Sequence, residues 1–189
     1  MRRILLPFSP PPFPLSFEID FNIINDHLMI SYILDGSLEN ISMIDQPVLP
    51  LQRKQELWTN TCFEWFVRSE SIQKYWEFNA SPKGEWNFYE LESYRKNLTE
   101  SKLIENPKIF QSSPYMGFGT GKFICLMEHS LKELYLQNPS LMENSQFAVT
   151  SVIRWKSGEI SYYSMNHRMD KPDFHSKDGF ILSPKKWEH

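Results

Sequence analysis

LWTNTCFEWFVRSESIQKYWEFNASPKGEWNFYELESYR, residues 57–95, contains four of the six tryptophans of this 189-residue chain, interleaved with glutamates. The stretch predicts three strands, at 61–67, 75–81 and 85–91, because aromatic and β-branched residues alternate with polar ones and a Pro-Lys-Gly turn separates the last two strands. Rings, carboxylates and amides at this density indicate either a very aromatic core or a surface that holds a ligand.

Successive side chains of a strand point to opposite faces of its sheet, so the alternation assigns these residues to two faces. Trp65, Trp76 and Phe78 fall at mid-strand positions on one face, where we expect them to form part of the core. Glu64 and Glu77 fall on the other face, and we expect them on neighbouring strands. The sequence therefore predicts a sheet with an aromatic inner face and an acidic outer face.

The two glutamates have three interpretations. A carboxylate on such a face can accept hydrogen bonds from ligand hydroxyls. It can instead form a structural ion pair with Arg95 or Arg154. The two carboxylates could also be the acids of a glycosidase, which lie about 5 Å or about 6.5–9.5 Å apart depending on the stereochemistry of the reaction.

The rest of the chain reads mainly as further short strands. We expect two hairpins, 15–21 with 27–34 and 146–155 with 159–165, and single strands at 107–111, 122–128 and 180–182. FGTGK (118–122) is interpreted as a turn, and 36–56 as a long loop with at most one short strand. One helix is expected from Ser130, which forms a capping box with Glu133, to just before Pro139. This pattern predicts an all-β, antiparallel β-sandwich with one short helix.

Two units are expected from the distribution of proline. Residues 1–14 form a proline-rich arm, interpreted as a strap held on the domain by Phe8 and Phe13. Residues 15–189 form a single β-sandwich domain. A role of the arm in docking a partner protein remains an alternative.

Charge and cysteine content narrow the function classes. The net charge is −3, with no basic stripe, so we expect no nucleic-acid partner. No apolar run reaches the length of a membrane span, and the N-terminal segment lacks a signal-peptide pattern. Cys62 and Cys125 lie in apolar strands and are expected to be buried thiols. We therefore expect a cytoplasmic protein with no membrane partner.

Polar residues late in the chain form a second group of candidates. His167, Asp173 and His175 have the spacing H-x5-D-x-H, which suits zinc or iron, a rigid loop, or contact with a polar ligand. No metal and no cofactor is assigned. Trp58 precedes a strand at a loop edge, where its ring could stack on a sugar or close the end of the core.

Three motifs together suggest a family. LWTNTCFEWFV, YWEFNASPKGEWNFYELESYR and WKSGEISYYSMNHRMDKPDFH occur in an order that resembles the DOMON-like family, related to family 9 carbohydrate-binding modules, from about residue 15 to 182. The resemblance implies a β-sandwich of the jelly-roll kind and carbohydrate binding. It implies binding-site roles for Trp58 and Glu64 and a second stacking ring, for which Trp155, Tyr162 and Tyr163 are candidates.

The resulting hypothesis is a non-catalytic module that binds a saccharide or a similar small polar ligand. An enzyme with a Glu/His constellation, with or without a metal, and a protein-interaction domain are the alternatives. The oligomeric state is left open. The predicted ligand-binding residues are Trp58, Glu64, Glu77, Asn79, Tyr89, Arg95, Tyr163, His167, Asp173 and His175.

Overall fold

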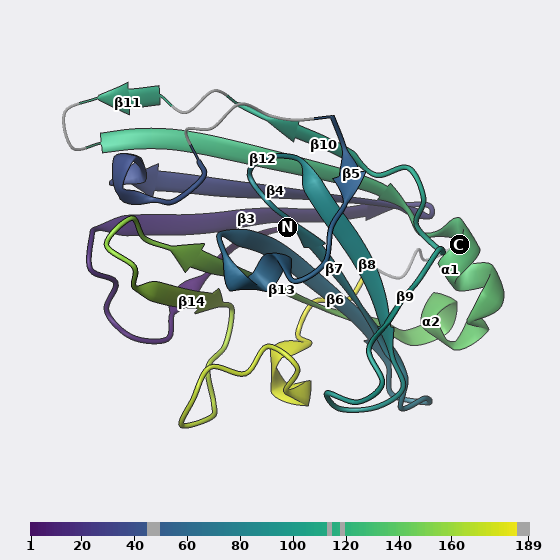
Figure 1. The fold of residues 1–189 in the computed structure, drawn as a ribbon. Helices are drawn as coiled ribbons and strands as arrows, with labels where there is room; N and C mark the ends of the chain where they lie inside the picture. The colour runs from purple at the N-terminus through teal and green to yellow at the C-terminus, as the bar shows by residue number, and fades with distance from the viewer. Residues whose placement is uncertain (45–49, 113–114, 118–119, 185–189) are drawn as a thin grey trace.

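The computed structural model describes residues 1–44, 50–112, 115–117 and 120–184. Two twisted sheets pack on each other, with their apolar faces forming one core between them (Figure 1). The predicted all-β, antiparallel sandwich is confirmed. Among the described residues, no helix is long and apolar enough to cross a membrane.

The first sheet has six strands and contains the hairpin predicted from 15–21 and 27–34, whose strands are longer than predicted and pair with Phe17 opposite Leu34. Of the turn predicted at 118–122, residues 118 and 119 lie outside the described residues and residues 120–122 instead begin a strand, with Thr120 paired to Gly117. The strand order is β1 (Arg2–Ile4), β3 (Leu15–Ile24), β4 (His27–Gly36), β12 (Thr120–Ser130) and β10 (Lys108–Gln111), with β11 (Tyr115–Gly117) on β12.

The second sheet has eight strands, and the three strands predicted from residues 57–95 are adjacent in it. All of its pairs are antiparallel except the short one between β5 and β8. The order is β2 (Leu6–Pro7), β14 (Ile160–Ser164), β13 (Ser145–Arg154), β6 (Cys62–Ser69), β7 (Tyr75–Ala80), β8 (Glu85–Leu91) and β5 (Gln52–Arg53), with β9 (Thr99–Glu100) on β8.

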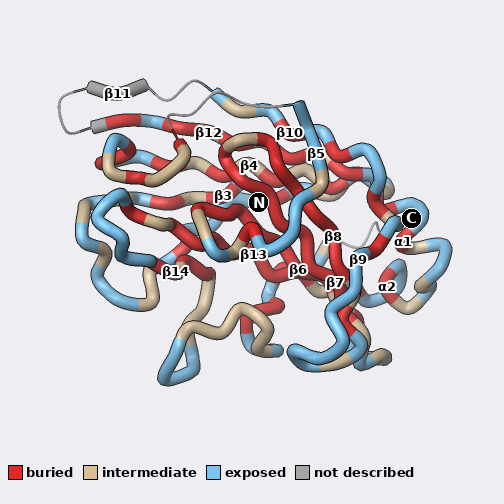
Figure 2. The backbone as a smooth tube through the Cα atoms, in the orientation of Figure 1, coloured by how far each residue is buried: buried red, intermediate tan, exposed pale blue. Residues whose placement is uncertain are grey.

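The core is aromatic, as the alternation predicts. Trp65, Trp76 and Phe78 are completely buried, and the rings of Trp65 and Phe78 stack with centroids 5.5 Å apart. The Tyr32 hydroxyl of the first sheet donates to the Glu64 carbonyl of the second at 2.6 Å and ties the two layers together. Figure 2 shows that burial continues along both sheets and that exposure is concentrated in the connections.

Two details of the prediction were wrong. The structure has two short helices, α1 (Lys132–Gln137) and α2 (Pro139–Asn144), where one was predicted. Pro139 stops the first helix but is also a favourable first residue for the second, because the missing N–H is unpaired there in any helix. The expected strand at 180–182 is a single bridge between Leu182 and Phe147.

The N-terminal residues contribute to both sheets. Residues 2–4 pair with β3 and residues 6–7 pair with β14, while Leu5 between them is buried. Phe8 packs edge-on against His167, and Phe13 packs on Trp155. Both rings therefore hold the segment on the domain, and its residues 2–4 and 6–7 belong to the two sheets.

Candidate functional site

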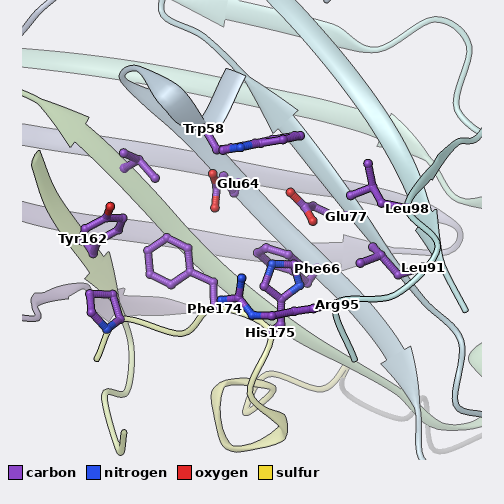
Figure 3. A pocket seen from close by; sticks show the side chains of 12 residues that line it. Trp58, Glu64, Phe66, Glu77, Leu91, Arg95, Leu98, Tyr162, Phe174 and His175 are labelled. Carbon is purple, nitrogen blue, oxygen red and sulfur yellow. The ribbon is translucent and has the colours of Figure 1, made fainter. Parts of the chain in front are cut away.

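A cavity of about 330 Å³ lies over the outer face of the eight-stranded sheet (Figure 3). Its base comes from β6, β7, β8 and β13, and its sides come from β14 and from the connections around these strands. It is lined by Trp58, Glu64, Phe66, Glu77, Leu91, Arg95, Leu98, Val152, Tyr162, Pro172, Phe174 and His175.

Two glutamates form the acidic base of the cavity. Glu64 on β6 lies opposite Asn79 on β7, and Glu77 precedes Asn79 by two residues on the same face. Such diagonal positions lie about 7–8 Å apart in a sheet, with longer side chains reaching closer. Glu64 is 2% exposed, Glu77 4% and Asn79 0%. The strands therefore place two carboxyl groups and one amide together, away from solvent.

Two of the five acceptor oxygens in this group have protein partners. Thr150 Oγ1 donates to Glu64 Oε2 at 3.0 Å, and Asn79 Nδ2 donates to Glu77 Oε1 at 2.7 Å. Within the described part of the chain, Glu64 Oε1, Glu77 Oε2 and Asn79 Oδ1 have no hydrogen-bond partner. A buried polar atom without a partner costs about 1–3 kcal/mol, so three together indicate a place for a ligand or ordered water.

Burial controls the ionisation of the acidic pair. Desolvation raises the pKa of Glu64 well above the usual carboxyl range, and the nearby charge of Glu77 raises it further. Desolvation also raises the pKa of Glu77, against the opposing effects of the Asn79 hydrogen bond and the Arg95 charge. The ligand-free pair consequently retains a proton at pH values at which ordinary glutamates are fully ionised.

Aromatic rings form the walls. Trp58 belongs to the 3-10 turn η2 (Leu57–Thr59), which begins after Glu56 in a left-handed conformation with φ 57°. Its indole packs edge-on against Tyr89, with centroids 5.7 Å apart. Tyr162 and Phe174 form another edge-on pair at 5.9 Å. In the view of Figure 3, both carboxylates lie below the Trp58 indole, Glu64 on the side of the Phe174 ring and Glu77 on the side of Leu91 and Leu98.

The rim is fixed by contacts between two loops. The Arg95 guanidinium donates to the Asp173 carboxylate at 2.8 Å, and the Tyr94 hydroxyl donates to the same carboxylate at 2.6 Å. Partial burial alone would raise the pKa of Asp173, but these two hydrogen bonds lower it below its ordinary value. The chain at residues 171–175 is therefore tied to the loop after β8.

His175 joins this rim to the sheet. Its Nδ1 lies 2.8 Å from the Tyr75 hydroxyl, which also accepts a hydrogen bond from the Arg95 backbone N–H. Desolvation, with a smaller contribution from the Arg95 charge, lowers the pKa of His175 to about 4. The imidazole is neutral at pH 7 and adds no positive charge to the cavity.

The structure brings together most of the predicted residues. Five of them line the cavity, namely Trp58, Glu64, Glu77, Arg95 and His175. Asn79, Tyr89 and Asp173 contact lining residues through the hydrogen bonds and the ring contact described above.

Two predicted residues lie elsewhere. Tyr163 is buried in the core between the sheets, where its ring packs on Phe17, and its neighbour Tyr162 reaches the cavity instead. His167 binds the Leu6 carbonyl with Nε2 at 2.8 Å and does not line the cavity. Trp155, a candidate for the second ring, is also in the core.

The structural ion pair with Arg95 or Arg154, one of the three interpretations of the glutamates, is not found: Arg95 pairs with Asp173, and the described structure contains no ion pair to Glu64 or Glu77. Several lining residues were not predicted: Phe66, Leu91, Leu98, Val152, Pro172 and Phe174. The alternation that selected Glu64 also places Phe66 on the same face, and Phe174 lies between Asp173 and His175, so those two had a detectable signal.

The described side chains contain no group of three or more His, Cys, Asp or Glu residues arranged to hold a metal ion. His167 and His175, which are close in sequence, have different surroundings: the first contacts the N-terminal segment and the second contacts Tyr75.

No protein-family model and no curated protein matches this chain. A solved structure from Bacteroides uniformis, that of a candidate carbohydrate-binding protein, is similar over 95% of this chain and 84% of its own, with a TM-score of 0.63 and 13% sequence identity. At this identity the likeness shows that the two chains share a fold.

Proposed function

We propose that this protein is a non-catalytic binding module whose ligand, a saccharide or a comparable small polar ring compound, occupies the cavity between Trp58 and Phe174. The observation that carries the proposal is the set of unpartnered buried oxygen atoms of Glu64, Glu77 and Asn79 beneath aromatic walls. Sugar hydroxyls donate to such oxygens, while the apolar face of a sugar ring packs on an indole.

Two further observations support a saccharide. The cavity volume of about 330 Å³ is at the lower end of the range typical of small-molecule sites. The structural neighbour from Bacteroides uniformis is a candidate carbohydrate-binding protein. We also propose, from the ordered motifs, a relationship to DOMON-like domains and family 9 carbohydrate-binding modules, and a cytoplasmic location in which the ligand is a soluble sugar or glycan fragment.

The test is calorimetric titration with a panel of mono- and disaccharides after a thermal-shift screen. Trp58→Ala removes one wall and should weaken binding about tenfold or more, since an aromatic contact with a ring contributes about 1–2 kcal/mol. Phe110→Ala is the matched control, because Phe110 is an exposed ring on the other sheet. Equal affinity of Trp58→Ala and wild type for a bound sugar would exclude the stacking role.

A glycosidase activity is the second candidate, favoured by the two buried acids with raised pKa in one cavity. Aryl glycosides of the bound sugar provide the assay. Release of the aryl group by wild type, lost in Glu64→Gln and Glu77→Gln, would establish hydrolysis. Binding without release would leave the module non-catalytic.

A further inference from the structure

The base of the cavity contains more hydrogen-bond acceptors than hydrogen-bond donors. The donors that reach it from the protein, Thr150 Oγ1 and Asn79 Nδ2, each serve one glutamate oxygen. Three oxygen atoms are left, one each from Glu64, Glu77 and Asn79. Because Asn79 lies across from Glu64 and two residues from Glu77 on one face, the three side chains are neighbours on the sheet, and the two glutamates line the cavity.

The same region is also acidic. The positive charge that acts on Glu77, that of Arg95, is at the rim and already forms an ion pair with Asp173. The other titratable groups that interact with the pair are neutral at pH 7: Tyr32 from within the sandwich, and Cys62, Tyr75 and Tyr89 from the outer face, all have pKa values raised by burial. His175 is neutral because its pKa is lowered. No residue of the described chain forms an ion pair with either glutamate.

We propose that the ligand carries a protonated primary amine, as in an amino sugar or a comparable ring-bearing amine, and that this ammonium group binds Glu64, Glu77 and Asn79. The inference rests on the proposed function and narrows the ligand class of the same cavity. An ammonium group has three N–H donors, which match the three unpartnered acceptors, whereas a neutral hydroxyl has one. Its charge also offsets the repulsion between two buried carboxylates, and the adjacent aromatic faces of Trp58 and Phe174 attract a cation.

Binding of such a ligand has a signature that a neutral sugar lacks. The raised pKa of both glutamates means that the ligand-free pair retains a proton near pH 7. An ammonium group stabilises the ionised carboxylates and takes the place of that proton. Binding near neutral pH should therefore release a proton to the buffer.

The experiment uses the full chain and paired probes: glucosamine, galactosamine and mannosamine, each with its neutral and N-acetylated counterpart, and cyclohexylamine with cyclohexanol. Calorimetry at pH 7 in two buffers of different ionisation enthalpy measures affinity and proton release together. The expected result is that at least one amine binds about tenfold or more tightly than its neutral counterpart, with proton release.

The double variant Glu64→Gln/Glu77→Gln should lose that preference and the proton release, since it removes both charges with little change in shape. Glu128→Gln on the first sheet, where Glu128 pairs with Lys108, is the control and should retain both. A thermal melt of each variant establishes that it is folded.

The outcomes separate the two proposals. Equal or tighter binding of the neutral or N-acetylated sugars would overturn the amine inference and leave the saccharide function standing. If cyclohexylamine binds and none of the sugars does, the result would support the inference of an amine ligand and overturn the saccharide function. Binding of none of the probes would contradict both.

Discussion

Strands β6, β7 and β8 have two faces that are equally buried and chemically opposite. On the inner face, Trp65 and Phe78 stack on each other and fill the space between the sheets. On the outer face, Glu64 and Glu77 are buried to the same degree, yet each leaves an oxygen without a partner. Packing dominates the inner face, although the indole N–H of Trp65 is also buried without a hydrogen-bond partner among the described residues. The outer face instead leaves carboxylate oxygens without a donor, and ligand binding gives a reason for them.

The largest loss of stability is expected for a substitution on the inner face. Trp65→Ala removes a completely buried ring and should lower the free energy of unfolding by about 3–5 kcal/mol, through lost burial and the cavity left behind. Trp58→Ala, on the partly exposed wall of the outer face, should change stability by about 1 kcal/mol or less. Chemical denaturation measures both. A similar loss in the two variants would contradict the division between a packing face and a binding face.

Substitution in the acidic pair should instead increase the free energy of unfolding at high pH, by less than the loss expected for Trp65→Ala. A raised pKa means that the folded state holds a proton that the unfolded chain has released, so stability falls as pH rises from the unfolded carboxyl value, about 4.3, through the raised values. Glu64→Gln removes one of these groups. The free energy of unfolding of this variant should exceed that of wild type by an amount that grows from near zero at about pH 4 to on the order of 2 kcal/mol at about pH 9.

Urea denaturation across that pH range checks the sign. Glu128→Gln, which breaks a partly exposed ion pair, should change stability by no more than about 1 kcal/mol at each pH. A stability difference between Glu64→Gln and wild type that is constant with pH would contradict the assignment of a buried, proton-retaining pair.

The smallest effect on stability is expected at the rim. Arg95→Ala removes a half-exposed guanidinium from Asp173 and should lower stability by about 1 kcal/mol or less. Its main effect should be local, because the contact joins the loop after β8 to residues 171–175. Hydrogen exchange should become faster in 171–175 and stay unchanged in β6 and β7. Unchanged exchange in 171–175 would show that other contacts hold this wall.

Sequence alone was enough to predict the arrangement of the central strands. The alternation in 57–95 placed Trp65 and Trp76 inward and Glu64 and Glu77 on a shared outer face, because side-chain direction in a strand follows from position alone. The same rule could not choose between Tyr162 and Tyr163. Both are aromatic, so the pattern of that strand did not show which tyrosine faces outward.

Contacts between distant loops could not be predicted in the same way. An ion pair between Arg95 and a glutamate was one interpretation of the sequence, but residues 171–175 fold over the sheet and bring Asp173 to Arg95. His167 and His175 are eight positions apart, yet one contacts the N-terminal segment and the other contacts Tyr75. These partners depend on the path of a loop, which has no periodic pattern to predict it.

The sequence by itself determined that this chain forms an antiparallel sandwich and that two carboxylates lie on one outer sheet face, because strand periodicity is a local property. Only the tertiary structure decided that this face is covered. The η2 turn, the loop after β8 and residues 171–175 surround it and bury the two carboxylates. That burial raises the pKa of the glutamates and turns an acidic patch into a cavity whose oxygens lack donors.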